Sequence, residues 1–297
     1  EFNEDGQRVF ALMGLLQTWE MNEEWSFDAA LDRSQTLKDD TGQRVNENVP
    51  AASGSSDDFT AISLGATYRQ ERWEWWNRIE MRQSDSEDKY GVTSGILSEP
   101  WQGTAFSADT QLFITDSTIG SRSTNFDLRL GTAYRPARSR WMLLDRFDFE
   151  FDRLDGLNTW RLINNLNANY KPHRRMQVSL QHGIKYVQDS IGDNTYSGVT
   201  DLFGLETRYD LSRRWDIGMH GSVLHSWNGG QLDYSLGASL GYLVMKNAWV
   251  SLGYNLLGFH DEDFSKANFT SQGPFVRFRF KFDQQSVREA VEWVNSQ

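Results

Sequence analysis

The feature that most constrains this chain is a strict two-residue alternation in long runs. From Trp215 to Val223 the odd positions are mostly large and apolar, whereas the even positions are polar or small: Asp216, Gly218, His220 and Ser222. Period-two alternation is typical of a β-strand whose two faces lie in different environments. Runs of about ten residues exceed the five or six of an ordinary globular strand and are long enough to cross a bilayer at a tilt. The pattern therefore predicts long, two-faced strands.

Such strands recur as hairpins around short polar or basic turns that are bracketed by large residues. The turns stand at 68–73, 134–141, 170–176, 209–215 and 242–249. Tyr and Trp settle at bilayer interfaces, and outer-membrane barrels carry aromatic girdles and short periplasmic turns. We predict that the bracketing aromatic residues form a girdle at the periplasmic rim: Tyr68, Trp73, Tyr134, Trp141, Tyr170, Tyr209, Trp215, Tyr242 and Trp249.

The alternation predicts an all-β fold, an antiparallel transmembrane β-barrel of about sixteen strands, of which about fifteen lie in this chain. The predicted strands are near 8–20, 25–34, 58–69, 73–83, 89–98, 104–115, 125–135, 141–152, 159–170, 176–188, 199–210, 215–227, 231–243, 248–259 and 273–282. Short periplasmic turns are expected to alternate with longer external loops. Because single-chain barrels normally close with an even number of strands, we expect an N-terminal segment or a partner chain to supply the missing strand.

The barrel is expected to span residues 1–283, followed by a periplasmic tail at 284–297. Within the tail, Ser286 and Glu289 have the spacing of a capping box, so the tail is either a short amphipathic helix or a frayed end. The final strand places Val276, Phe278, Phe280 and Phe282 on one side and basic residues on the other. This strand resembles the aromatic closing strand that barrel-assembly machinery recognises.

Composition narrows the classes of function. The chain has 297 residues, a net charge of -11, 12 Trp and no Cys, and its mean hydropathy is -0.62. The absence of Cys removes disulfides and thiolate metal sites. The acidic balance argues against a nucleic-acid partner, which favours a basic surface. Half of every barrel strand faces water, so a low hydropathy agrees with a barrel.

Charged residues of one strand parity are predicted to line the lumen. They are Glu74, Arg78, Glu80, Arg82, Asp127, Arg129, Arg146, Asp148, Glu150, Glu206, Arg208, Arg277 and Arg279. Both signs occur at neighbouring heights, which favours cross-strand pairing that stiffens a wet interior. The alternative is a selectivity zone for a charged solute.

Two other groups of residues bear on chemistry. His220 and Ser222 share one strand face, with His225 near the strand's outer end, so a Ser-His hydrolase is conceivable, but no orienting carboxylate is evident. His182 lies on the apolar parity, where an interfacial role is expected. In loop 260–264, Asp261, Glu262 and Asp263 could hold a cation but lack EF-hand spacing. No catalytic residue, metal ligand or cofactor is assigned.

The end of the chain, residues 253–283, resembles the C-terminal outer-membrane barrels of very large, repeat-bearing surface proteins of Gram-negative bacteria. The residues that carry the resemblance are Gly253, Tyr254, Asn255, Gly258, Phe259, Asp261, Asp263, Phe264, Gly273, Pro274, Phe275, Val276, Arg277, Phe278, Lys281, Phe282 and Asp283. The resemblance implies a role in anchoring or translocating a large surface-exposed or secreted protein. The hairpin pattern also resembles exopolysaccharide-export barrels in general form.

The expected function is therefore that of a non-enzymatic outer-membrane barrel that anchors or translocates such a protein. The alternatives are a porin or exopolysaccharide channel, and an outer-membrane hydrolase. The expected partners are outer-membrane lipid and lipopolysaccharide, the barrel-assembly machinery, and the source of the missing strand.

Overall fold

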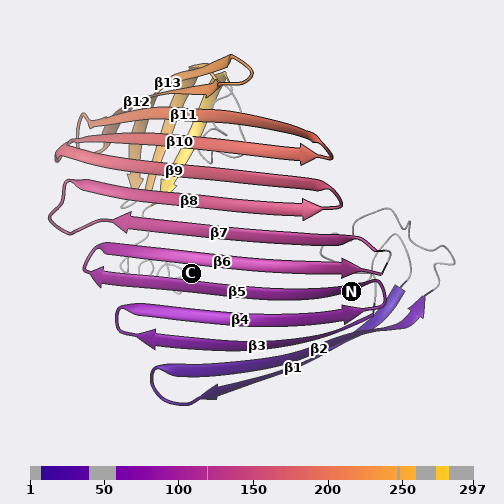
Figure 1. The fold of residues 1–297 in the computed structure, drawn as a ribbon. Coiled ribbons are helices and arrows are strands. Elements are labelled where there is room, and N and C mark those ends of the chain that lie inside the picture. Colours follow the sequence, from indigo (N-terminus) through magenta and orange to yellow (C-terminus); the bar gives the residue numbers. More distant parts are fainter. Residues whose placement is uncertain (1–7, 40–57, 119, 246–247, 259–271, 281–297) are drawn as a thin grey trace. The chain divides into compact units, whose positions relative to one another are not determined.

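The computed structural model describes residues 8–39, 58–118, 120–245, 248–258 and 272–280. Over these residues the chain forms one antiparallel sheet of 15 strands that lie in chain order (Figure 1). The prediction of about fifteen visible strands is confirmed. The strands are β1 (Arg8–Glu20), β2 (Trp25–Asp39), β3 (Phe59–Gln70), β4 (Trp73–Ser84), β5 (Glu87–Trp101), β6 (Thr104–Ser117), β7 (Arg122–Tyr134), β8 (Trp141–Leu154), β9 (Leu157–His173), β10 (Met176–Ile191), β11 (Asn194–Asp210), β12 (Trp215–Ser226), β13 (Gln231–Met245), β14 (Ala248–Leu257) and β15 (Gly273–Phe280).

Most connections are short at both ends of the hairpins, so the prediction of longer external loops is corrected at five of the seven connections away from the aromatic turns. At the end away from the aromatic turns, strands are joined by residues 85–86, 118–121, 155–156, 192–193 and 227–230, and only 40–58 and 258–272 are longer. The residues expected in loops instead extend the strands, because paired backbone groups do not require apolar side chains. The β8–β9 turn is the pair Asp155–Gly156, with φ of 40° and 83°, which suits a tight two-residue hairpin.

The sheet has one apolar face and one polar face. On the apolar face Ile217, Leu240, Leu252 and Val276 lie opposite one another across four strands, and their exposed fractions are 43%, 45%, 61% and 56%. On the other face, the neighbouring row contains Asp216, Gly241, Ser251 and Arg277. The large apolar side chains of this row therefore lie on an exposed face of the sheet and are not packed in a buried core.

The described strands belong to two compact units, which we describe separately. Unit 1 comprises residues 1–132, 147–162 and 187–196, and unit 2 comprises residues 133–146, 163–186 and 197–297. In the part of the chain that the structure describes, no helix has the length and apolar character needed to cross a membrane. The tail at 284–297, loop 260–264 and Phe282 lie outside the described residues.

Candidate functional site

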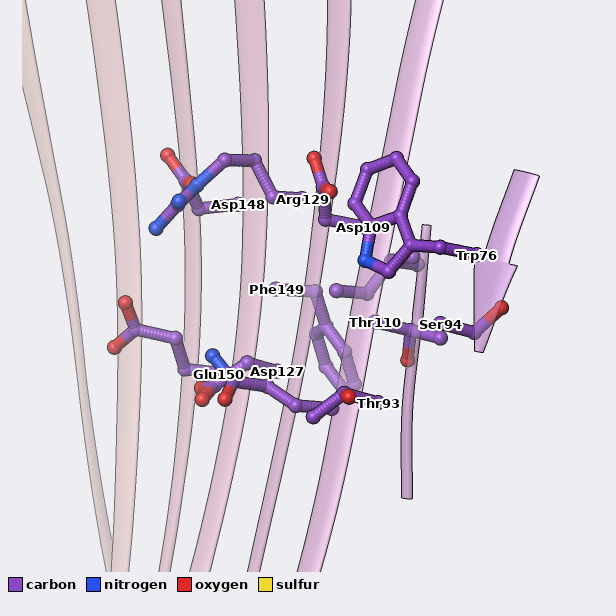
Figure 2. Close-up of a pocket in the computed structure, with 12 residues that line it drawn as sticks. Trp76, Thr93, Ser94, Asp109, Thr110, Asp127, Arg129, Asp148, Phe149 and Glu150 are labelled. Atoms are coloured by element: carbon purple, nitrogen blue, oxygen red, sulfur yellow. The ribbon is translucent and has the colours of Figure 1, made fainter. Parts of the chain in front are cut away.

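A groove of about 390 Å³ lies on the polar face of unit 1, over strands β4 to β8 (Figure 2). Its lining combines the aromatic rings of Trp76 and Phe149 with charged and polar side chains. The residues are Trp76, Thr93, Ser94, Asp109, Thr110, Gln111, Asp127, Leu128, Arg129, Asp148, Phe149 and Glu150. The charged lining residues alternate along β7 and β8, so the charged part of the groove follows from the period-two pattern.

Trp76 lies against the sheet because the residue opposite it is Gly95. A side chain at position 95 would collide with the indole ring. Gly95 is itself buried, so the ring covers the backbone of β5 and presents an aromatic surface to the groove. Sequence reasoning missed Trp76, although it shares the parity of Glu74 and Arg78.

Two of the carboxylates in the groove are paired with arginines. The Arg129 guanidinium donates from Nε to Asp148 Oδ1 at 2.9 Å, and the Asp148 side chain is only 7% exposed. Arg161 donates to Glu150 Oε2 at 2.7 Å. Figure 2 shows Arg129 directed toward Asp148 at one edge of the groove. These pairs fix the wall of the groove.

The two other carboxylates, those of Asp109 and Asp127, form no hydrogen bond or close ion pair with the residues that the structure describes. Arg129 is the only cation among the lining residues, against four carboxylates. The groove is therefore acidic, and it combines hydrogen-bond acceptors with the aromatic surface of Trp76.

Other predicted lumen residues of unit 1 are also on the polar face. Glu74 accepts two hydrogen bonds from Arg69, at 3.0 and 2.9 Å. Arg78 donates to Asp28 at 2.8 Å. Arg82 stacks 4.0 Å from the centroid of the Phe59 ring. Glu80 lies opposite Ser63 and Gly91 and takes no part in the groove.

In unit 2, the polar face carries a connected group of charges, which we call the arginine–carboxylate cluster. Arg208 contacts Glu206 at 3.1 Å and Asp216 at 3.7 Å. Arg277 lies 3.5 Å from Glu206, and Arg279 lies 3.6 Å from Asp216. The cluster links β11, β12 and β15. Arg146, also of unit 2, is exposed and lies outside the cluster.

Small residues on β13 and β14 make this cluster possible. A side chain at Gly241 would collide with the Asp216 carboxylate, and one at Gly253 would collide with the Phe275 ring. Asp216, Gly241 and Ser251 lie opposite one another in successive strands. The long side chains of β12 and β15 therefore meet above a floor of small residues.

The residues considered for hydrolase chemistry contact other partners. His220 Nε2 lies 2.9 Å from Asn255 Oδ1, and Ser222 Oγ lies 2.6 Å from Ser235 Oγ. His225 Nδ1 lies 3.5 Å from Asp201 Oδ1. No Ser-His hydrogen bond forms among these described residues, so the arrangement does not assemble a nucleophile and its base.

Most of the predicted girdle lies at one end of the strands on the apolar face, but Trp249 does not. Trp215 packs on Tyr242 at 4.8 Å between ring centroids, and Trp141 on Tyr170 at 4.5 Å. Trp249 lies opposite Arg279, whose guanidinium is 4.8 Å from its ring, on the polar face.

A register shift beside the β13–β14 turn explains the correction. Tyr242 pairs with Val250, so Val250 takes the place on the apolar face that the sequence pattern gave to Trp249. The remaining girdle residues include the contacting pair Tyr68–Trp73, with ring centroids 5.3 Å apart. Tyr134 is the last residue of β7. Tyr209 lies near the end of β11, and its ring centroid is 6.2 Å from that of His173.

Asp28, Asp109, Arg161 and Asp216 were also missed by the sequence analysis. Asp109, Arg161 and Asp216 share the polar face with a predicted lumen residue on a neighbouring strand, so extending the parity count would have found them. Asp28 has no such neighbour on β1 or β3, and its contact is with Arg78 of β4. Of the closing strand, Val276 and Phe278 are 56% and 64% exposed on the apolar face. Among the described residues, no group of three or more His, Asp or Glu could hold a metal ion.

No protein-family model and no curated protein matches the chain. Solved structures of outer-membrane proteins match it over most of its length. The outer-membrane channel DcaP of Acinetobacter baumannii aligns with a TM-score of 0.42 and 10% identity, over 86% of this chain and 92% of that chain. BamA from Haemophilus ducreyi lacking POTRA domains 1-3 aligns with a TM-score of 0.42 and 9% identity, over 92% of this chain and 70% of that chain. OmpT, an outer membrane protein of Vibrio cholerae, aligns with a TM-score of 0.36 and 8% identity, over 75% of this chain and 88% of that chain. At these low scores and identities, the functional proposal rests on the residues of the sheet.

Proposed function

We propose that this chain is an integral outer-membrane β-barrel of a Gram-negative bacterium, and that it anchors or translocates a large surface-exposed or secreted protein. The observation that carries the proposal is the two-faced sheet. One face presents exposed Leu, Ile, Val and Phe side chains bounded by Trp and Tyr, and the other presents charged and small polar residues. A face of this kind is suited to lipid, whereas in water it would promote aggregation.

The strand order supports closure through a further strand. In an antiparallel meander of fifteen strands, β1 and β15 run in the same direction. Direct pairing of these two strands would be parallel, whereas an additional strand between them would pair antiparallel with both. An N-terminal segment or a partner chain is the proposed source, and the barrel-assembly machinery and lipopolysaccharide are the proposed partners in assembly.

The anchoring role is supported by the arginine–carboxylate cluster of unit 2. Its contacts connect the closing hairpin β14–β15 to β11 and β12 through side chains as well as through the backbone ladder. The residues that resemble the large surface proteins lie partly in this hairpin. A closing hairpin held in this way suits a barrel that must remain intact under the load of a large attached protein.

A channel for hydrophilic solutes, either a porin or an exopolysaccharide exporter, is the second candidate, and the groove of unit 1 favours it. Trp76 offers a flat apolar surface beside the unpaired carboxylates of Asp109 and Asp127. Aromatic rings and carboxylates together can hold a cationic or hydroxyl-rich solute.

Planar-bilayer recording of the intact chain separates the two roles. An anchor should show little steady conductance, because an open barrel would leak periplasmic solutes. Stable cation-preferring openings, reduced in preference by Asp109→Asn together with Asp127→Asn, would favour the channel instead. Fractionation tests the location itself, since recovery of the chain outside the outer membrane would reject both roles.

A further inference from the structure

A hydrogen-bonded polar pair interrupts the apolar face of unit 2. Asn164 of β9 donates from Nδ2 to Asp145 Oδ1 of β8 at 2.9 Å. Asp145 has the same strand parity as Trp141, which stacks on Tyr170, and the opposite parity to Asp148, which pairs with Arg129 on the polar face. A carboxylate and an amide therefore lie among side chains that face lipid under the proposed function.

A third polar side chain, that of His182 on β10, joins the same patch. Asn169 accepts hydrogen bonds from Ser179 at 2.5 Å and from Gln177 at 3.1 Å, and Thr159 donates to Asp189 at 2.8 Å. We take Asn169–Ser179 and Thr159–Asp189 as directly opposite pairs of β9 and β10, since both give the same register. Counting along both strands from these contacts places His182 opposite Leu166 and diagonal to Asn164. His182 is exposed and forms no hydrogen bond among the described residues. We call Asp145, Asn164 and His182 the polar patch.

The polar patch lies inside the apolar band. Asp145 is four residues beyond Trp141, and His182 is six residues beyond Met176 at the start of β10. These separations correspond to roughly 13 and 20 Å along the strands. Lipid headgroups at the rims do not reach this depth, and lipid tails offer no hydrogen bonds. A polar side chain here is stabilised only by protein groups.

We propose that the polar patch is the centre of a contact between two copies of this chain in the membrane, with His182 of each copy facing the Asp145–Asn164 pair of the other. The proposal rests on the membrane location proposed above. A two-fold axis brings one surface against itself, so the surface must be self-complementary. The patch meets this condition because it carries an imidazole donor together with a carboxylate acceptor.

Apolar residues around the patch supply matching packing surface. Leu143, Leu166 and Ile184 share its face and are 37%, 37% and 42% exposed. In the contact, these side chains exclude lipid from the polar groups and strengthen the hydrogen bonds between copies. The alternative is that Asp145 and Asn164 satisfy each other within one monomer and that His182 has no partner.

Cysteine cross-linking in outer membranes tests the contact, because the chain contains no native Cys. Leu166→Cys places a thiol at the centre of the patch. Leu240→Cys, on the apolar face of β13 and 45% exposed, is the matched control. We expect oxidation to give a covalent dimer from Leu166→Cys, and about tenfold less from Leu240→Cys, as a preference of about 1.4 kcal/mol produces.

Polar-patch variants then assign the dimer to the patch. Asp145→Leu with Asn164→Leu and His182→Leu, added to Leu166→Cys, should abolish the cross-link, while heat-modifiable migration reports that the barrel is still folded. Equal cross-linking from both thiols, a monomer only, or a dimer that survives these substitutions would each overturn the contact. A chain absent from the outer-membrane fraction overturns the proposed function as well, whereas a monomer inside that fraction overturns the contact alone.

Discussion

The carboxylate of Asp216 lies 3.6 Å from the guanidinium of Arg279, although two strands, β13 and β14, separate β12 from β15 in the sheet. Arg208 of β11 approaches the same carboxylate at 3.7 Å. Asp216 is 3% exposed, so its carboxylate is shielded from water, whereas the Arg279 side chain is 39% exposed. One buried carboxylate therefore connects β15 to the neighbouring strands β11 and β12, although the backbone ladder joins β15 to them only through β13 and β14.

The floor beneath this carboxylate should not tolerate a side chain. Gly241→Leu places carbon atoms where the Asp216 carboxylate lies, so Asp216 must leave its arginines or β13 must shift. Overpacking of this kind costs about 1–3 kcal/mol. Urea unfolding of the chain in detergent micelles or liposomes measures the loss. Ala238→Leu, on the exposed apolar face of the same strand, is the control and should change stability far less.

Removal of the carboxylate should leave the largely buried Arg208 with Glu206 as its remaining carboxylate partner and should take from Arg279 its contact with Asp216. We expect Asp216→Ala to lower the free energy of unfolding by about 1–3 kcal/mol, the cost of unsatisfied buried polar groups. Asp116→Ala is the control, because its pair with Arg122 has side chains that are 48% and 65% exposed. Exposed pairs contribute at most about 1 kcal/mol.

A double-mutant cycle isolates the long-range contact. If Asp216 and Arg279 interact, Asp216→Ala and Arg279→Ala together should cost less than the sum of the two single changes. Strict additivity would mean that the two side chains contribute independently, and the cross-strand connection described above would then have no energetic role.

The two faces of the sheet should respond differently to charge. Val92 of β5 is 45% exposed on the apolar face, whereas Gln111 of β6 is exposed on the polar face. If the apolar face contacts lipid, Val92→Arg should cost about 2–4 kcal/mol near the bilayer midplane. Gln111→Arg should be mild because its side chain faces water. Equal penalties at the two positions would argue against a lipid-facing surface.

The number and order of the strands could be predicted because alternation is local information. From Trp215 to Ser222 the polarity of each residue indicates the face on which it lies, and the register of β12 with β13 preserves that alternation. The ends of the strands could not be predicted in the same way. The strand ends that begin at Asn194 and Glu87 carry polar residues on both faces, so no alternation marks them in the sequence. Their pairing depends on the opposite strand instead.

The site was harder to predict than the fold, because it depends on which small residues lie opposite large ones. Nothing in the local sequence of Gly95 indicates that Trp76 will cover it, or that Gly241 will make room for Asp216. These pairings arise from the register of neighbouring strands. The misassignment of Trp249 has the same origin, since a single irregularity beside a turn moves every later residue to the other face.

The assignment of Trp215 and Trp249 to different faces gives a final prediction. Because the chain has no native Cys, Trp215→Cys and Trp249→Cys can each carry a single nitroxide spin label. A label at 215 should collide more often with oxygen, which concentrates in the bilayer, since this position lies on the apolar face beside Tyr242. A label at 249 should collide more often with a water-soluble nickel chelate, because this position lies beside Arg279 on the polar face. Power-saturation electron paramagnetic resonance in liposomes measures both collision rates, and identical profiles at the two positions would return Trp249 to the girdle and contradict the register of β13 with β14.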